Sequence, residues 1–76
     1  MALTVQQIRQ DVADVLGEDP TDIPDDEDLG DHGLDSVRLM SLVEWWRREH
    51  AAEISFVDLA ERPAIEVWAA LMGAHA

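Results

Sequence analysis

The sequence has no cysteine, no lysine and no tyrosine, and it has a single phenylalanine. Without cysteine there is no disulfide, no thiolate ligand and no thiol nucleophile, and a reducing cytoplasm is the expected location. No apolar run approaches the ~20 residues that span a bilayer. Residues 1–4 contain no basic segment leading into an apolar one. We therefore expect no membrane segment and no signal peptide.

Positive charge is also scarce. Five arginines face 17 acidic residues, which gives a net charge of −12 over 76 residues. A chain this acidic repels nucleic-acid phosphates and anionic membrane surfaces, so neither is an expected partner. The length predicts one domain, residues 1–76, and the 47% hydrophobic content predicts a small folded core. A binding or carrier module fits this length, whereas a large enzyme with a deep pocket does not.

Apolar residues recur at steps of three and four along most of the chain, which is the helical period. They predict helices over about 4–16, 36–49, 55–61 and 64–72. Thr4 and Gln7 have the spacing of a capping box, and Ser55 is placed to cap the third helix. No alternating strand pattern is present. The expected fold is all-α, a four-helix bundle with a long loop between the first two helices and a short third helix.

The expected long loop is the most acidic part of the chain. It contains two prolines and no arginine. The apolar residues Ile23, Leu29 and Leu34 are isolated within it, and we expect them to anchor the loop to the core. A structureless loop of this length in a small domain is usually functional. Its acidic residues are Glu18, Asp19, Asp22, Asp25, Asp26, Glu27, Asp28, Asp31 and Asp35.

Two chemical interpretations of this region fail on spacing. A calcium loop begun at Asp26 would need glycine at its sixth position and glutamate at its twelfth, but Asp31 and Val37 stand there. Ser36 does not lie in the G-x-S-x-G turn of hydrolases, and His32 has nothing in the sequence to orient it. We therefore expect neither catalytic residues nor a metal site.

Ser36 has two interpretations. A serine or aspartate directly before an apolar-periodic segment is the commonest helix cap, so Asp35 and Ser36 could simply start a helix. The surrounding run GLDSVRLM, residues 33–40, resembles the phosphopantetheine attachment motif of carrier proteins. Its Val-Arg-x-Met continuation is most similar to aryl carrier domains of siderophore synthesis. The similarity continues through residues 46–48, 56–60 and 62–63, up to the last helix. Ala64, where relatives often have threonine, and the second indole of Trp45 depart from it.

The resemblance implies a 4'-phosphopantetheine arm on Ser36, with Asp35 as the adjacent motif residue. Coenzyme A would be the donor and a phosphopantetheinyl transferase the enzyme that attaches it. Further implied partners are an adenylating enzyme for salicylate or 2,3-dihydroxybenzoate and a condensation or cyclisation domain of nonribosomal peptide synthesis, with the chain itself a monomer. The implied docking residues are Val37, Arg38, Met40, Phe56 and Ala60.

Alternatives remain open at this stage. Met40 lies one helical turn after Ser36, on the face expected to carry the arm, but Met40 and Phe56 could instead fill the core. A peptidyl carrier would share the serine and the bundle. Fatty-acid carriers typically have a strongly acidic second helix, whereas this one carries Arg38, Arg47 and Arg48. From another class, an acidic interaction protein such as a nucleic-acid mimic would spread its charge over a whole face, which this chain does not.

Overall fold

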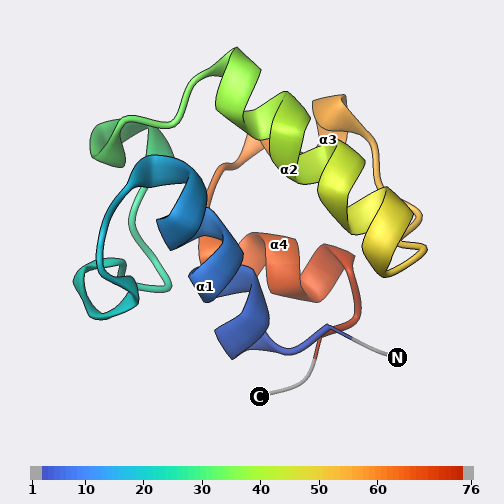
Figure 1. The fold of residues 1–76 in the computed structure, drawn as a ribbon, viewed down its shortest axis with the longest axis horizontal. Coiled ribbons are helices and arrows are strands. Elements are labelled where there is room, and N and C mark those ends of the chain that lie inside the picture. The colour runs from blue at the N-terminus through green and yellow to red at the C-terminus, as the bar shows by residue number, and fades with distance from the viewer. Residues whose placement is uncertain (1–2, 75–76) are drawn as a thin grey trace.

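The structure is a computed structural model that describes residues 3–74, so the first two residues of the opening segment lie outside it. The described residues form helices and contain no strand, which confirms the all-α bundle (Figure 1). The four α-helices begin and end within one residue of the expected positions. The elements are α1 (Val5–Leu16), η1 (Pro20–Asp22), η2 (Leu29–His32), α2 (Ser36–Glu49), α3 (Phe56–Glu61) and α4 (Ile65–Leu71).

Side-chain caps define where the first and third helices begin. The Thr4 hydroxyl accepts the Gln7 backbone N–H at 3.1 Å, and the Ser55 hydroxyl accepts that of Asp58 at 3.2 Å. The predicted capping box is nevertheless wrong in its second half. The Gln7 side-chain amide donates to Asp11 Oδ1 at 2.8 Å, one turn further along α1. In a capping box the Gln7 side-chain oxygen would instead accept the Thr4 backbone N–H. Here the side chain extends to the Asp11 carboxylate, whose charge strengthens the hydrogen bond that it accepts.

Helix α4 has no side-chain cap at its start, as expected from alanine at position 64. Ala64 occupies the N-cap position with extended backbone angles and supplies no side-chain hydrogen bond. Beyond the other end, Gly73 adopts a left-handed conformation with φ 64°, and its N–H donates to the Ala70 carbonyl. The helix therefore stops at a glycine but starts without the cap that a hydroxyl would provide.

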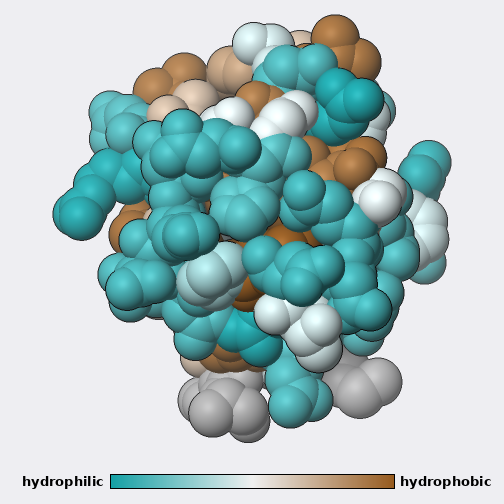
Figure 2. Space-filling view, turned by 90° about the vertical axis from the view of Figure 1, so that its left-hand side faces the viewer, coloured by the Kyte–Doolittle hydropathy of each residue, from teal (hydrophilic) through white to brown (hydrophobic). Residues whose placement is uncertain are grey.

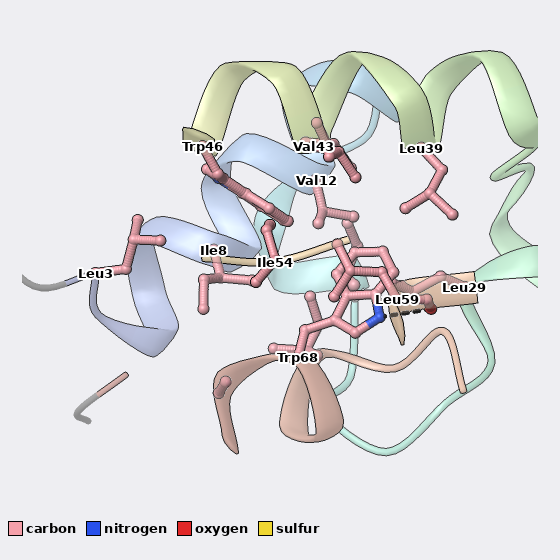
Figure 3. Close-up of a cluster of buried hydrophobic side chains, with 14 of the residues drawn as sticks. Leu3, Ile8, Val12, Leu29, Leu39, Val43, Trp46, Ile54, Leu59 and Trp68 are labelled. Carbon is pink, nitrogen blue, oxygen red and sulfur yellow. Dashed lines mark hydrogen bonds between the residues drawn. The ribbon is translucent and has the colours of Figure 1, made fainter. Parts of the chain in front are cut away.

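Two tryptophans form the centre of the core. The rings of Trp46 and Trp68 meet edge to face, with centroids 5.8 Å apart and planes at 75°. Both indole N–H groups are satisfied, since Trp46 donates to Asp11 Oδ2 at 2.8 Å and Trp68 donates to the Leu59 carbonyl at 2.9 Å (Figure 3). Leu39, Leu42, Val43 and Trp46 recur at helical steps along α2, and all four lie in this core. The other core residues are Leu3, Ile8, Val12, Ala13, Ile23, Leu29, Ile54, Leu59, Ile65 and Ala69.

The acidic segment between α1 and α2 is more ordered than the structureless loop we expected. It contains η1 and η2, capped by the Asp19 and Asp28 carboxylates. These short turns have no apolar period, so the sequence pattern does not reveal them. Ile23 and Leu29 are buried as expected, and Leu34 is half-buried against the core. The face formed on this side of the molecule is mostly hydrophilic, with apolar atoms visible in gaps between the polar side chains and along the upper edge of the view (Figure 2).

Two backbone hydrogen bonds attach this segment to the far end of the chain. The Leu29 N–H donates to the Pro63 carbonyl at 2.7 Å, and the Glu66 N–H donates to the Asp25 carbonyl at 3.0 Å. Arg9 of α1 adds an ion pair with Asp25. The segment is thus joined to α1, to the link between α3 and α4, and to the first turn of α4.

None of the helices in residues 3–74 has the length and apolar character needed to cross a membrane. The cytoplasmic location expected from composition stays a prediction.

Candidate functional site

The approach to Ser36 is a tight turn at the end of η2. Gly33 has φ 97°, a left-handed conformation that side-chain-bearing residues rarely adopt. Its N–H donates to the Gly30 carbonyl at 3.2 Å, and the Leu34 N–H donates to the Leu29 carbonyl at 3.1 Å. Leu34 then packs against the core. The turn and the anchor together fix the direction in which the chain enters α2.

Asp35 is the residue that caps α2. Its Oδ1 accepts the Arg38 backbone N–H at 2.9 Å, and its Oδ2 accepts the Arg38 guanidinium at 2.8 Å. The backbone N–H of Arg38, helped by its guanidinium charge, lowers the pKa of the Asp35 carboxyl below its ordinary value. The helix-cap interpretation is therefore correct for Asp35, while Ser36 is the first residue inside the helix. The cap leaves the Ser36 side chain free for another role.

The Ser36 hydroxyl differs from every other hydroxyl of the chain, all of which lie in the described residues. It is exposed, and it has no hydrogen-bond partner within residues 3–74. The other hydroxyls are engaged, either as caps or as donors. They are Thr4 with Gln7, Thr21 with Asp19, Ser41 with the Val37 carbonyl, and Ser55 with Asp58. Ser36 is thus the one exposed hydroxyl that no hydrogen bond within residues 3–74 occupies.

A shallow groove of about 260 Å³ begins at Ser36 and runs between α2 and α3. Phe56 and Ala60 of α3 form one wall, and Leu39 of α2 contributes to the other. The remaining lining residues are Gly30, Leu34, Asp35 and Pro63. An apolar groove beside an exposed hydroxyl can receive part of a flexible chain attached there.

The five expected docking residues lie on two helices, with Val37, Arg38 and Met40 on α2 and Phe56 and Ala60 on α3. Val37 and Met40 project from α2 with 76% and 51% of their surface exposed. Ala60 is exposed and Phe56 half-buried, and both line the groove. Phe56 also packs against the core, as one of its two interpretations expected, and its docking role stays a prediction. Arg38 is held by Asp35, an i, i+3 pair that the sequence spacing allows.

His32 was misjudged from the sequence. Its ring nitrogens lie 3.3 Å from Glu18 Oε2 and 3.3 Å from Glu27 Oε1, so two carboxylates orient it. These partners are 14 and 5 residues away in an irregular segment, and no periodic pattern could have paired them. Across residues 3–74 no group of three His, Cys, Asp or Glu side chains is suited to hold a metal ion.

Comparison with known proteins identifies the family. Residues 6–72 match the family described as "Phosphopantetheine attachment site". The chain is 59% identical over 69 residues to an isochorismatase of Bacillus subtilis, covering 91% of this chain and 22% of that protein. It is 44% identical over 69 residues to phenyloxazoline synthase MbtB of Mycolicibacterium paratuberculosis, covering 91% and 6%. It is 38% identical over 73 residues to acyl carrier protein ScoB of Streptomyces coeruleorubidus, covering 96% and 85%.

The chain thus spans less than a quarter of the isochorismatase and of the synthase, but most of the acyl carrier protein. No solved structure gives a significant match.

The site fits the group that gives the family its name. A phosphodiester needs a reachable hydroxyl, and its negative charge is favoured at a helix N-terminus. Ser36 provides both at the start of the 14-residue α2, and Arg38 neutralises the nearest carboxylate, Asp35. The groove beside Ser36 offers apolar surface to the attached chain. The chain belongs to the phosphopantetheine attachment-site family, whose members carry covalently bound 4'-phosphopantetheine.

Proposed function

We propose that this domain is an aryl carrier. It would hold an aryl acid of the salicylate or 2,3-dihydroxybenzoate type on a phosphopantetheine arm at Ser36, for siderophore-type nonribosomal peptide synthesis. The observation that carries the proposal is the exposed, unpartnered Ser36 hydroxyl at the start of α2 beside an apolar groove. We propose that the chain acts as a carrier without chemistry of its own, since within residues 3–74 the groove is shallow and no acid or base side chain is hydrogen-bonded to Ser36.

The attachment is a phosphoryl transfer catalysed by a phosphopantetheinyl transferase. The Ser36 oxygen forms a bond to the phosphorus that bears the pantetheine, and the pyrophosphate bond of coenzyme A breaks. The hydroxyl proton passes to a base of the transferase, and adenosine 3',5'-bisphosphate leaves. When bound, phosphopantetheine supplies a thiol that holds an acyl group as a thioester. The roles of Ser36 and Asp35 on this chain are to present the oxygen and to fix the helix that bears it.

Partner enzymes would dock on the surface around Ser36. Val37 and Met40 give α2 an apolar exposed edge, and Phe56 and Ala60 continue it across the groove to α3. Arg38 is tied to Asp35, so this edge has little net charge and favours an apolar contact. We propose three partners here, namely the transferase, an aryl-acid adenylating enzyme and a condensation or cyclisation domain. The chain would bind each of them as a monomer.

The aryl cargo is supported by the names of the relatives. The isochorismatase is named for a ring carboxylate, and the phenyloxazoline synthase for a product bearing a phenyl group. The second candidate is a peptidyl carrier, because the attachment serine and the bundle would be the same. The acidic mimic loses its support, since the family match extends over residues 6–72.

The first test is priming. The protein is incubated with coenzyme A and a promiscuous transferase, and its intact mass is measured. We expect one phosphopantetheinyl group on the wild type and none on Ser36→Ala. Ser41→Ala, which removes another exposed hydroxyl of α2, is the matched control and should be modified at the wild-type rate. Modification that survives in Ser36→Ala would refute the assignment.

The second test is loading. The primed protein is offered side by side to adenylating enzymes for aryl acids and for amino acids, and thioester formation is followed by mass. We expect faster loading with an aryl acid, with unprimed Ser36→Ala as the blank. Faster loading with an amino acid would place the domain in the peptidyl class.

A further inference from the structure

A cluster of one imidazole and two carboxylates lies immediately before the site. His32 has 16% of its side chain exposed, and its Nδ1 and Nε2 lie 3.3 Å from Glu18 and from Glu27 respectively. The two carboxylates are more exposed than the ring between them. The ring is thus largely enclosed and contacts an acidic oxygen at each nitrogen.

The three residues join distant points of the acidic segment. Glu18 follows the end of α1, Glu27 precedes the Asp28 cap of η2, and His32 is the last residue of η2. The segment contains nine carboxylates and no arginine. Arg9 and Arg38 reach it from the flanking helices, pairing with Asp25 and Asp35. Within residues 3–74, His32 is the one further cation that pairs with it.

The geometry favours the charged form of the ring. A neutral imidazole has one N–H and one lone pair, so it can donate to one carboxylate while its lone pair faces the other. The imidazolium donates to both. The hydrogen bond to Glu27, with further contributions from Glu18, raises the pKa of His32 above its ordinary value, against the opposing effect of desolvation. Glu18 and Glu27 are the charged groups that contact the ring within residues 3–74.

His32 is also close to Ser36 along a constrained path. Gly33 follows it with φ 97°, Leu34 is anchored in the core, and Asp35 caps α2. The hydrogen bond from the Leu34 N–H to the Leu29 carbonyl closes the turn that contains His32. A displacement of His32 is therefore transmitted to the start of α2 through only three residues.

We propose that His32 is a positioning residue for modification of Ser36. In its charged form it would join both ends and the middle of the acidic segment, and so hold the start of α2 in the arrangement that the transferase binds. This inference rests on the proposed attachment at Ser36. Loss of the proton removes one of the two links, so the segment loosens and priming slows as the pH rises through the pKa of His32.

The experiment measures titration and priming together. The ring of His32 is titrated by NMR in the unprimed protein, with His50→Gln to remove the signal of another histidine. Priming rates of wild type and His32→Gln are measured from pH 5.5 to 9, and their ratio at each pH cancels the transferase's own pH dependence. We expect the wild type to be about two- to fivefold faster on the acidic side, the range of an exposed ion pair. The ratio should fall with the NMR midpoint, which should lie above 6.5.

Glu27→Gln supplies the second arm. Removal of this carboxylate should lower the NMR midpoint of His32, and the midpoint of the priming profile should fall with it. Two results in the wild type would overturn the inference, namely a ratio of priming rates that stays constant with pH or an NMR midpoint of His32 at or below 6.5. A third is a Glu27→Gln protein in which the NMR midpoint shifts while the midpoint of the priming profile does not. Because Glu27→Gln retains His32, the test holds even where His32→Gln does not fold. Absence of priming at every pH would instead refute the proposed function, and this inference with it.

Discussion

The variant Met40→Ala tests whether Met40 serves docking or fills the core, because the two roles predict different losses of stability. Met40 is 51% exposed, whereas its neighbour Leu39 is 4% exposed. Full burial of a methionine side chain is worth about 1.5–3 kcal/mol, so half-burial leaves about 1 kcal/mol to lose and no closed cavity to create. Leu39→Ala should cost about 2–5 kcal/mol. In a domain of this size 1 kcal/mol corresponds to about 4–8 °C in Tm, so the two variants should melt at clearly different temperatures.

The functional assay follows two steps in order. Met40→Ala should still be converted fully to the primed form, because Ser36 and its Asp35 cap are unchanged, and the transfer assay starts from this primed protein. Its acyl group should then pass more slowly to the downstream condensing enzyme. Loss of an interface anchor worth about 1–2 kcal/mol slows this step about 5- to 30-fold. Single-turnover transfer from the loaded protein measures it directly.

Leu71→Ala is the matched control for Met40→Ala. Leu71 is 50% exposed but lies at the end of α4, outside the groove beside Ser36. It should lose a similar amount of stability and transfer its cargo at the wild-type rate. A Met40→Ala protein that transfers as fast as Leu71→Ala, or that melts as low as Leu39→Ala, would refute the docking role.

Two further predictions concern stability, measured by denaturant unfolding. Ala64→Thr should add the missing hydroxyl cap of α4 and raise the free energy of unfolding by about 0.5–2 kcal/mol, and an unchanged midpoint would contradict that account of the helix start. Gly33→Ala should lower it by about 1–2 kcal/mol through its left-handed backbone alone, since no atom lies within 4 Å of the added Cβ. Gly30→Ala is the contrast, because there the Cβ would meet the Asp28 carboxylate at 2.9 Å. A Gly33→Ala protein as stable as wild type would show that the turn adapts.

The parts of the fold that sequence predicted are those with a repeating pattern or a short-range pair. The stripe of α2 that ends at Trp46 repeats with the helical period, and Ser55 caps a residue only three positions away. The Gln7 side chain was predicted wrongly because it has two possible partners, the Thr4 backbone N–H and the Asp11 carboxylate, and spacing alone does not rank them.

The candidate site was predicted unevenly for the same reason. Ser36 and Asp35 lie in one contiguous motif, so the sequence was enough to single them out. Phe56 meets them only because α3 packs against α2, and whether it fills the core or lines a groove is a question of packing. His32 contacts a carboxylate 14 residues away, and this contact became visible only in three dimensions.

The two backbone hydrogen bonds that join the acidic segment to Pro63 and to Glu66 of α4 have a consequence for local opening. The amides of Leu29 and Glu66 both donate to carbonyls more than 30 residues away, so these hydrogen bonds break when the two segments separate. We expect both amides to exchange at one common rate, as a single cooperative unit. The acidic segment beside Ser36 would then move together with α3. An enzyme that binds α3 would therefore also restrain the turn that leads to the serine.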